Sequence, residues 1–454
     1  MKRVIILSIM LVVVLGASLG LAKENSPASE GPEFETEFVV VRAYFDDPSI
    51  LDAVTARNEP WEIDREAGYI VLSATPLEFE WLESLGFRLE VDEKLTTLYS
   101  TPNERSPGQT NGIPGYSCYR TVEETFADVE AIVLENPNLA AWIDVGDSWE
   151  KATPSGLPGY DIMVLRLTNE SIAGPKPKLL ISTGVHAREY TPPELNMRFA
   201  EFLIDNYDVD ADVTWLLDYH EIHLLPFTNP DGRKHAETGV SWRKNTNENY
   251  CSPTSSNRGA DLNRNFEFQW GSWGGSSGSE CDSTYRGPAP GSEPETQALQ
   301  NYGRSIFPDQ RDDPLTSAAP ITATGVYLDI HSSGDLVLWP WGFTNDVAPN
   351  GTALQTLGRK FAYFNGYDPS QSITLYPADG TTEEFGYGEM GLATYTIEMG
   401  GSFFESCGYF EDTIVPGNLP AMLYAAKVVR TPYLTPAAKY PLWILSGPYS
   451  RNST

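Results

Sequence analysis

Three side chains in this sequence have the types and the spacing of a catalytic metal site. His186 and Glu189 stand three residues apart, and His331 follows far along the chain. Two imidazoles and a carboxylate can hold a catalytic zinc ion and leave its fourth position open for water. Zinc lowers the pKa of that water to about 7, which makes it a nucleophile near neutral pH. These residues therefore predict metal-assisted hydrolysis.

The segments around these residues predict how the fold brings them together. Residues 179–183 form an apolar run, which predicts a strand covered on both faces, directly ahead of the His186 loop. The prolines at 192–193 suit the first turn of a following helix. His331 directly follows a second predicted strand, residues 326–330, in the same way. Ligands bind at the carboxyl ends of strands in open α/β sheets, so we expect both segments to meet at one site.

The other histidines are weaker ligand candidates than these two. His223 lies inside an apolar strand, which favours a core or surface role over metal ligation, and we expect His220 and His235 at the surface. Glu398 ends another predicted strand, residues 393–397. A carboxylate beside the metal can take a proton from water and deliver it to a leaving amine.

Composition and the first residues predict an exported protein. The chain has 454 residues with 31 basic and 62 acidic side chains, for a net charge of −31, which argues against nucleic acid or an anionic membrane as partner. Residues 1–22 have the basic start, apolar core and small residues of a secretory signal peptide, and no later apolar run approaches a membrane span. Four cysteines fit an extracellular protein with one or two disulfides.

The remaining chain divides by its patterning. The order β-α-β-β-α-β within residues 34–94 predicts a small α+β ferredoxin-like domain, rich in acidic residues, in segment 23–94. Residues 95–115 are rich in Thr, Ser, Pro, Asn and Gly, which predicts an exposed linker; Arg105 is the expected processing site, unless the linker is never cut. Residues 116–435 alternate helix and strand and predict an α/β domain with a large mixed, mostly parallel twisted sheet and helices on both faces. A short tail, 436–454, follows.

Seven short motifs follow one another along the chain: residues 184–189, 228–232, 242–244, 261–265, 330–332, Tyr376 and 396–398. Together they resemble the zinc metallocarboxypeptidases of the pancreatic carboxypeptidase A/B type and their secreted bacterial relatives. The resemblance covers roughly residues 115–432, and the domain before it resembles the activation prodomain of these enzymes. It implies a zinc exopeptidase that hydrolyses the C-terminal peptide bond of peptides and proteins.

The resemblance also implies roles for individual side chains. His186, Glu189 and His331 would hold one zinc ion per catalytic domain. Glu398 would act as the general base, and Arg243 would stabilise the oxyanion that forms on the scissile carbonyl.

The remaining roles concern substrate binding and support of the metal. Asn263, Arg264 and Tyr376 would clamp the free carboxylate of the substrate, which only a chain end carries. Arg188 would line the next substrate subsite, and Asp261 would orient a zinc-bound imidazole.

The resemblance extends to the cysteines and to regulation. Cys251 and Cys281 correspond to the paired cysteines of the family, which leaves Cys118 and Cys407 as a further pair that the sequence cannot prove. The prodomain would act as an intramolecular inhibitor of a monomeric enzyme.

Glu383 bears on substrate preference. It stands seven residues after Tyr376, where enzymes of the A type place an apolar residue and those of the B type an aspartate. A carboxylate there favours a C-terminal Lys or Arg. The alternatives are a Glu383 that turns away, with broad or apolar preference, and a related zinc hydrolase that acts on cell-wall peptides or modified amino acids. A binding protein without catalysis fits less well, because all ligands and Glu398 are present.

Overall fold

The computed structural model describes residues 37–154 and 157–434. The predicted signal peptide (1–22) and the predicted tail (436–454) lie outside the described residues. Within the described part of the chain, no helix is long and apolar enough to cross a membrane.

The first described elements form a small antiparallel sheet in the order β2-β3-β1-β4. Its elements are β1 (Val39–Tyr44), α1 (Leu51–Thr55), β2 (Glu62–Asp64), β3 (Tyr69–Ala74), α2 (Pro76–Ser84) and β4 (Arg88–Val91). Thr75 and Glu78 form a reciprocal capping box that fixes the start of α2. The chain order and strand order are those of the predicted ferredoxin-like fold.

The segment predicted as a linker differs from expectation at its start. Residues 93–100 form α3 (Glu93–Ser100), which overlaps the linker predicted from residue 95. The Asp92 side chain caps this helix at Leu95, and Tyr99 is buried in the hydrophobic core. Packing of apolar residues on one helix face therefore overrides the Thr- and Ser-rich composition.

The second sheet has eight strands in the order β11-β10-β12-β9-β7-β8-β6-β5. The strands are β5 (Ala140–Asp147), β6 (Asp161–Leu167), β7 (Lys178–Thr183), β8 (Glu221–Leu225), β9 (Val326–His331), β10 (Leu336–Trp339), β11 (Asp368–Gln371) and β12 (Ala393–Glu398). The central strands β12, β9, β7 and β8 are parallel neighbours, whereas the β5–β6, β6–β8 and β10–β12 pairings are antiparallel. This confirms the predicted large mixed sheet, in which parallel strands form the centre.

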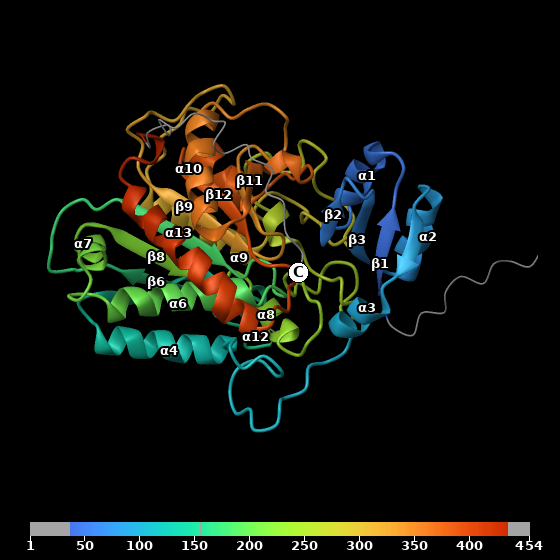
Figure 1. Ribbon diagram of the computed structural model, residues 1–454, viewed down its shortest axis with the longest axis horizontal. Helices are drawn as coiled ribbons and strands as arrows, with labels where there is room; N and C mark the ends of the chain where they lie inside the picture. The colour runs from blue at the N-terminus through green and yellow to red at the C-terminus, as the bar shows by residue number, and fades with distance from the viewer. Residues whose placement is uncertain (1–36, 155–156, 435–454) are drawn as a thin grey trace, which may run out of the picture. The chain divides into compact units, whose positions relative to one another are not determined.

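Helices cover both faces of this sheet (Figure 1). The described helices of this domain are α4 (Val122–Glu135), α5 (Trp149–Ala152), α6 (Thr191–Asp205), α7 (Ala211–Tyr219), α8 (Pro230–Ala236), α9 (Pro294–Ile306), α10 (Gly351–Asn365), α11 (Thr382–Glu384), α12 (Cys407–Tyr409) and α13 (Val415–Val428). Side chains alternate along a strand, so Leu179 and Ile181 of β7 pack in the core that includes α6 and α13, whereas Leu180 packs in the core that includes α9. Burial on both faces explains why the central strands are continuously apolar.

Two disulfides tie this domain together. Cys251 pairs with Cys281, and Cys118 pairs with Cys407. The second bridge links the start of the domain to the segment after β12, and it settles a pairing that the sequence left open.

A buried carboxyl group at the start of α9 links stability to pH. Glu295 is fully buried and accepts hydrogen bonds from the Trp149 amide at 2.7 Å and from Asn245 Nδ2 at 3.2 Å. Burial, together with the nearby Glu293 and Asp231, raises the pKa of Glu295 to about 8. The native state therefore favours the protonated carboxyl group. Its contribution to the free energy of unfolding is fully present below the unfolded-state pKa of about 4.3 and is lost as pH rises toward the native-state pKa of about 8.

We expect the stability of Glu295→Gln relative to the parent, measured as the difference between their free energies of unfolding, to increase as pH rises from 5 to 8. The parent loses up to about 1.4 kcal/mol per pH unit from this group, because the unfolded chain releases this proton to water in this pH range while the buried native carboxyl group keeps it, and glutamine cannot titrate. Urea unfolding at pH 5, 6.5 and 8 measures the difference. A difference that stays constant across this range would contradict the linkage.

Candidate metal and substrate site

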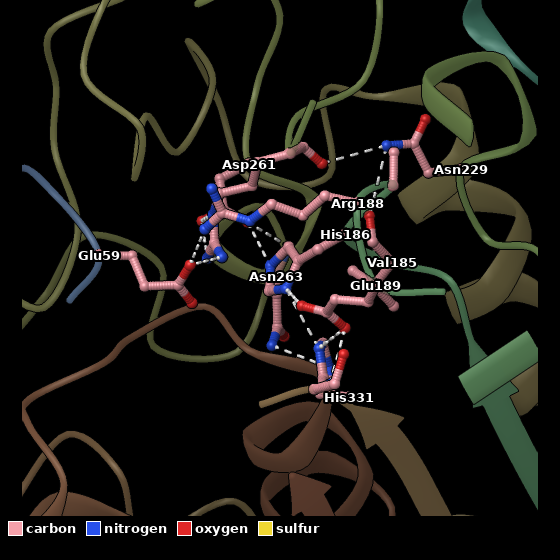
Figure 2. A network of polar contacts seen from close by, with 12 residues as sticks. Glu59, Val185, His186, Arg188, Glu189, Asn229, Asp261, Asn263 and His331 are labelled. Atoms are coloured by element: carbon pink, nitrogen blue, oxygen red, sulfur yellow. Dashed lines mark hydrogen bonds and ion pairs between the residues drawn. The ribbon is translucent and has the colours of Figure 1, made fainter. Parts of the chain in front are cut away.

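Three predicted ligands converge in the structure, and Figure 2 shows them with their neighbours. His186 Nδ1 lies 2.7 Å from Glu189 Oε1, and His331 Nδ1 lies 3.1 Å from Glu189 Oε2. The two Nδ1 atoms are 3.1 Å apart, and all three side chains are buried. Each residue offers one ligand atom, and these atoms lie within 4.8 Å of one another. Two imidazole nitrogens and a carboxylate that face one point fit a divalent cation such as zinc.

The backbone explains this convergence. β7 and β9 are parallel neighbours with Thr183 opposite Ile330, so both chains leave the sheet at the same edge. Gly184 follows β7 with φ of +64°, a conformation that favours glycine, and a Cβ there would lie 3.2 Å from the Pro226 carbonyl oxygen. The chain thereby turns His186 toward His331, and α6 begins two residues after Glu189.

A carboxylate contacts the Nε2 atom of each imidazole, on the side away from Glu189. Asp261 Oδ1 lies 3.2 Å from His186 Nε2, which is the contact expected from the sequence. Asp329 Oδ2 lies 2.7 Å from His331 Nε2, a contact that the motifs did not predict. The available signal was the spacing, since residues two apart on a strand share a face.

Electrostatics follow from this arrangement. Burial alone would raise the pKa of Glu189, but the imidazoles of His331 and His186 hold it well below its usual range. Burial alone would lower the pKa of His331, but the carboxylates of Asp329 and Glu189 raise it well above its usual value. Both shifts arise because carboxylates and imidazoles lie in direct contact within the buried cluster.

Two predicted arginines border the cluster and share one acidic partner. Arg243 donates to Asp261 Oδ2 at 2.7 Å, and Arg188 donates to Glu59 Oε2 at 2.6 Å. Glu59 also forms an ion pair with Arg243. Although burial opposes its ionisation, Arg243 and Arg188 lower the pKa of Glu59. Glu59 precedes β2 of the small domain, and no sequence motif singles it out.

One cavity gathers the remaining predicted side chains. Its lining includes Asn263, Arg264, Tyr376, Glu383 and Glu398. These residues come from the 3₁₀ turn Leu262–Arg264, the loop before α11, α11 itself and the end of β12. Glu398 lies opposite His331 in the β12–β9 pairing, so the end of the cavity that Glu398 lines lies beside the predicted metal ligands.

The floor of this cavity carries two carboxyl groups. Glu383 accepts from the Ser372 hydroxyl at 2.6 Å, and Glu384 accepts from the Gly342 amide at 2.6 Å. Burial and the neighbouring Glu384 raise the pKa of Glu383 well above its usual value. Glu383 is buried at the cavity and does not swing out to solvent.

Burial also raises the pKa of Glu398 to about 8. Nearby Glu189 and Glu59 act in the same direction, whereas His331 and Arg243 oppose the shift. A cation held by the three ligands would favour the carboxylate form.

The remaining histidines lie away from the cluster. His223 is buried in β8 and lies 2.7 Å from the Tyr302 hydroxyl through Nδ1, as expected for a core residue. His220 is also buried, so the predicted surface position is wrong. It follows α7, where its Nδ1 lies 3.2 Å from the Leu216 carbonyl oxygen and its ring packs against Trp215. His235 is half-buried and stacks on Trp242.

Comparison with known proteins decides the family. The family model described as zinc carboxypeptidase, Peptidase_M14, matches residues 126–413. The chain belongs to the zinc carboxypeptidase family. It is 30% identical over 368 residues to a zinc carboxypeptidase of Saccharothrix mutabilis subsp. capreolus, covering 78% of this chain and 79% of that protein. It is 26% identical over 423 residues to carboxypeptidase A1 of Rattus norvegicus, covering 88% of this chain and 91% of that protein.

Solved structures support the fold of this zinc carboxypeptidase. Carboxypeptidase A from Helicoverpa armigera superposes with a TM-score of 0.67 at 19% identity, covering 88% of this chain and 99% of that chain. Thrombin activatable fibrinolysis inhibitor superposes with a TM-score of 0.64 at 20% identity, covering 87% of this chain and 99% of that chain. At these identities the comparison concerns the fold alone.

Proposed function

We propose that this protein is a secreted zinc exopeptidase that removes C-terminal residues, with preference for Lys and Arg. The family supplies the zinc carboxypeptidase activity, and the proposal adds the roles of individual residues, the substrate preference and the export. The observation that supports it best is one cavity that joins Asn263, Arg264 and Tyr376 to Glu383 and Glu398.

The chemistry divides between the metal and the chain's own groups. His186, Glu189 and His331 would hold zinc, which when bound supplies a Lewis acid and lowers the pKa of water. Glu398 would take a proton from water and deliver it to the leaving amine. Arg243 would face the developing oxyanion once its pairing with Glu59 is broken.

The cavity would hold the last residue of the substrate. The guanidinium of Arg264 and the amide of Asn263 can donate to a free carboxylate, and the Tyr376 hydroxyl can join them. This requirement for a chain end would make the enzyme an exopeptidase. A basic side chain would then reach Glu383, and its positive charge would favour the carboxylate form of a group whose pKa is otherwise raised.

We expect kcat/KM to be higher for peptides that end in Arg or Lys than for matched peptides that end in Phe or Leu. A hydrogen bond to a charged group contributes about 1.5–3 kcal/mol, so the preference should reach roughly 10- to 100-fold. It should also increase with pH, because the Glu383 pKa is raised and ionisation strengthens the pairing. Steady-state kinetics on the four peptides between pH 6 and 9 measures both effects.

Substitution of Glu383 separates this preference from general activity. Glu383→Gln keeps the size of the side chain but removes its charge, so it should lower turnover of Arg and Lys peptides and spare the Leu peptide. If the parent enzyme prefers Phe or Leu peptides and Glu383→Gln shows the same preference, the enzyme has a broad or apolar preference instead. Hydrolysis of cell-wall peptides without hydrolysis of ordinary peptides would favour the alternative zinc hydrolase.

We also propose that residues 37–100 keep a monomeric precursor latent until the chain is cut near Arg105. Arg105 is exposed, as cleavage requires. The segment before β2 lies against the catalytic domain: Arg57 pairs with Asp282 at 3.0 Å, and the Glu59 amide donates to Ser283 Oγ at 3.0 Å. Glu59 then covers both cleft arginines, which supports inhibition by blocking them.

A further inference from the structure

Asp329 is the closest polar partner of His331 on the side away from the ligand cluster. Its Oδ2 lies 2.7 Å from His331 Nε2, whereas Asn263 Nδ2 lies 3.5 Å from the same nitrogen. Both Asp329 and His331 are fully buried. β9 places them two residues apart on one face of the strand, so the backbone itself fixes the pairing.

Hydroxyl groups from two other elements hold the Asp329 carboxylate in place. Ser182 of β7 lies opposite Asp329 in the sheet and donates to Oδ1 at 2.6 Å. Tyr327 OH lies 2.9 Å from the Ser182 oxygen, and Thr382 of α11 donates to Oδ2. These partners orient the carboxylate and add no positive charge.

The two aspartates behind the imidazoles therefore differ in electrostatic character. Asp261 serves His186 and also pairs with the Arg243 guanidinium, which offsets its charge. The hydroxyl groups that donate to Asp329 are neutral, so these contacts leave its negative charge facing the His331 imidazole without the offset that Arg243 gives to Asp261. A carboxylate that accepts from the far nitrogen of a ligating histidine fixes the tautomer and increases the basicity of the ligand.

We propose that Asp329 is a positioning residue that directs the Nδ1 lone pair of His331 to the metal and tightens the hold of the site on zinc. This inference rests on the proposed zinc site. It also connects that site to the substrate cavity, because Thr382 is the residue before Glu383 and donates to the same carboxylate.

The test is zinc affinity of the purified full chain, measured by competition with a chromogenic chelator. Asp329→Asn keeps the shape of the side chain and removes its charge, and we expect its Kd for zinc to rise by about 10- to 100-fold. Ser182→Ala is the matched control, because it removes a donor from Oδ1 and leaves the oxygen that faces His331. A role in packing alone predicts equal losses in both variants, whereas positioning predicts a much larger loss in Asp329→Asn.

A readout on the parent protein keeps the outcome decisive if Asp329→Asn folds poorly, and a second readout applies if the variant folds. In the unsubstituted zinc-loaded protein, imidazole ¹⁵N spectra should place a slowly exchanging proton on His331 Nε2; zinc on Nε2 would overturn the proposal. In the folded variant, the visible spectrum of the cobalt-loaded site should shift. Zinc affinity within about twofold of the parent would overturn the positioning role but leave the zinc site intact. A parent chain that binds no zinc would instead overturn the proposed function.

Discussion

Glu398→Gln is expected to lower kcat/KM for peptide hydrolysis by about 100- to 10,000-fold while zinc stays at one ion per chain. Glutamine fills the same space at the end of β12 but cannot accept and return a proton. The metal ligands belong to β9 and to the loop after β7, so they should keep their places. Single-turnover hydrolysis and metal analysis of the same preparation measure both quantities.

His331→Ala provides the contrasting control for this experiment. It removes one of the three ligand atoms, so zinc should be lost together with activity. Near-normal turnover by Glu398→Gln would remove Glu398 as the base. Full zinc content in His331→Ala would mean that the third ligand lies elsewhere.

Glu59→Gln is expected to release activity from the uncut precursor. In the structure, the Glu59 carboxylate pairs with Arg188 and Arg243, two groups that the substrate would need. Removing one member of a buried charged pair costs about 2–5 kcal/mol, much of it from the partner left unpaired. The closed form should weaken accordingly, and the precursor should hydrolyse a small substrate at least about tenfold faster.

The design compares precursor and trimmed forms of each variant. Trimmed parent and trimmed Glu59→Gln should have equal rates, because cleavage near Arg105 separates Glu59 from the catalytic domain. Glu80→Gln is a matched control, since Glu80 is exposed on α2 of the same domain. A Glu59→Gln precursor as latent as the parent would show that steric covering suffices. Equal rates for the parent precursor and its trimmed form, on small and peptide substrates, would mean that the domain only assists folding.

Local patterns in the sequence identify the elements that carry the ligands. Each predicted ligand lies at or just after the end of an apolar run, and such a run needs cover on both faces. Parallel strands buried in this way end at one edge of the sheet, so the pattern alone predicts that His186 and His331 meet there. The resemblance to the family places Glu383 in the substrate pocket through its spacing from Tyr376, and both residues lie on one short stretch of chain.

Contacts between distant segments are beyond such patterns. His220 is expected at the surface because a polar residue before a strand is usually exposed, but packing against Trp215 buries it. Glu59 is one acidic residue among many in its domain, and only the fold places it on Arg188 and Arg243.

The sequence by itself therefore determined the family and predicted the candidate metal ligands, because these depend on residue types at strand ends. Only the tertiary structure decided what surrounds each ligand. Asp329 became the partner of His331 because β9 fixes their common face while Ser182 and Thr382, from β7 and α11, orient its carboxylate. Those partners come from segments far apart in the chain, and strand register and loop packing, which no local pattern encodes, bring them within hydrogen-bond distance.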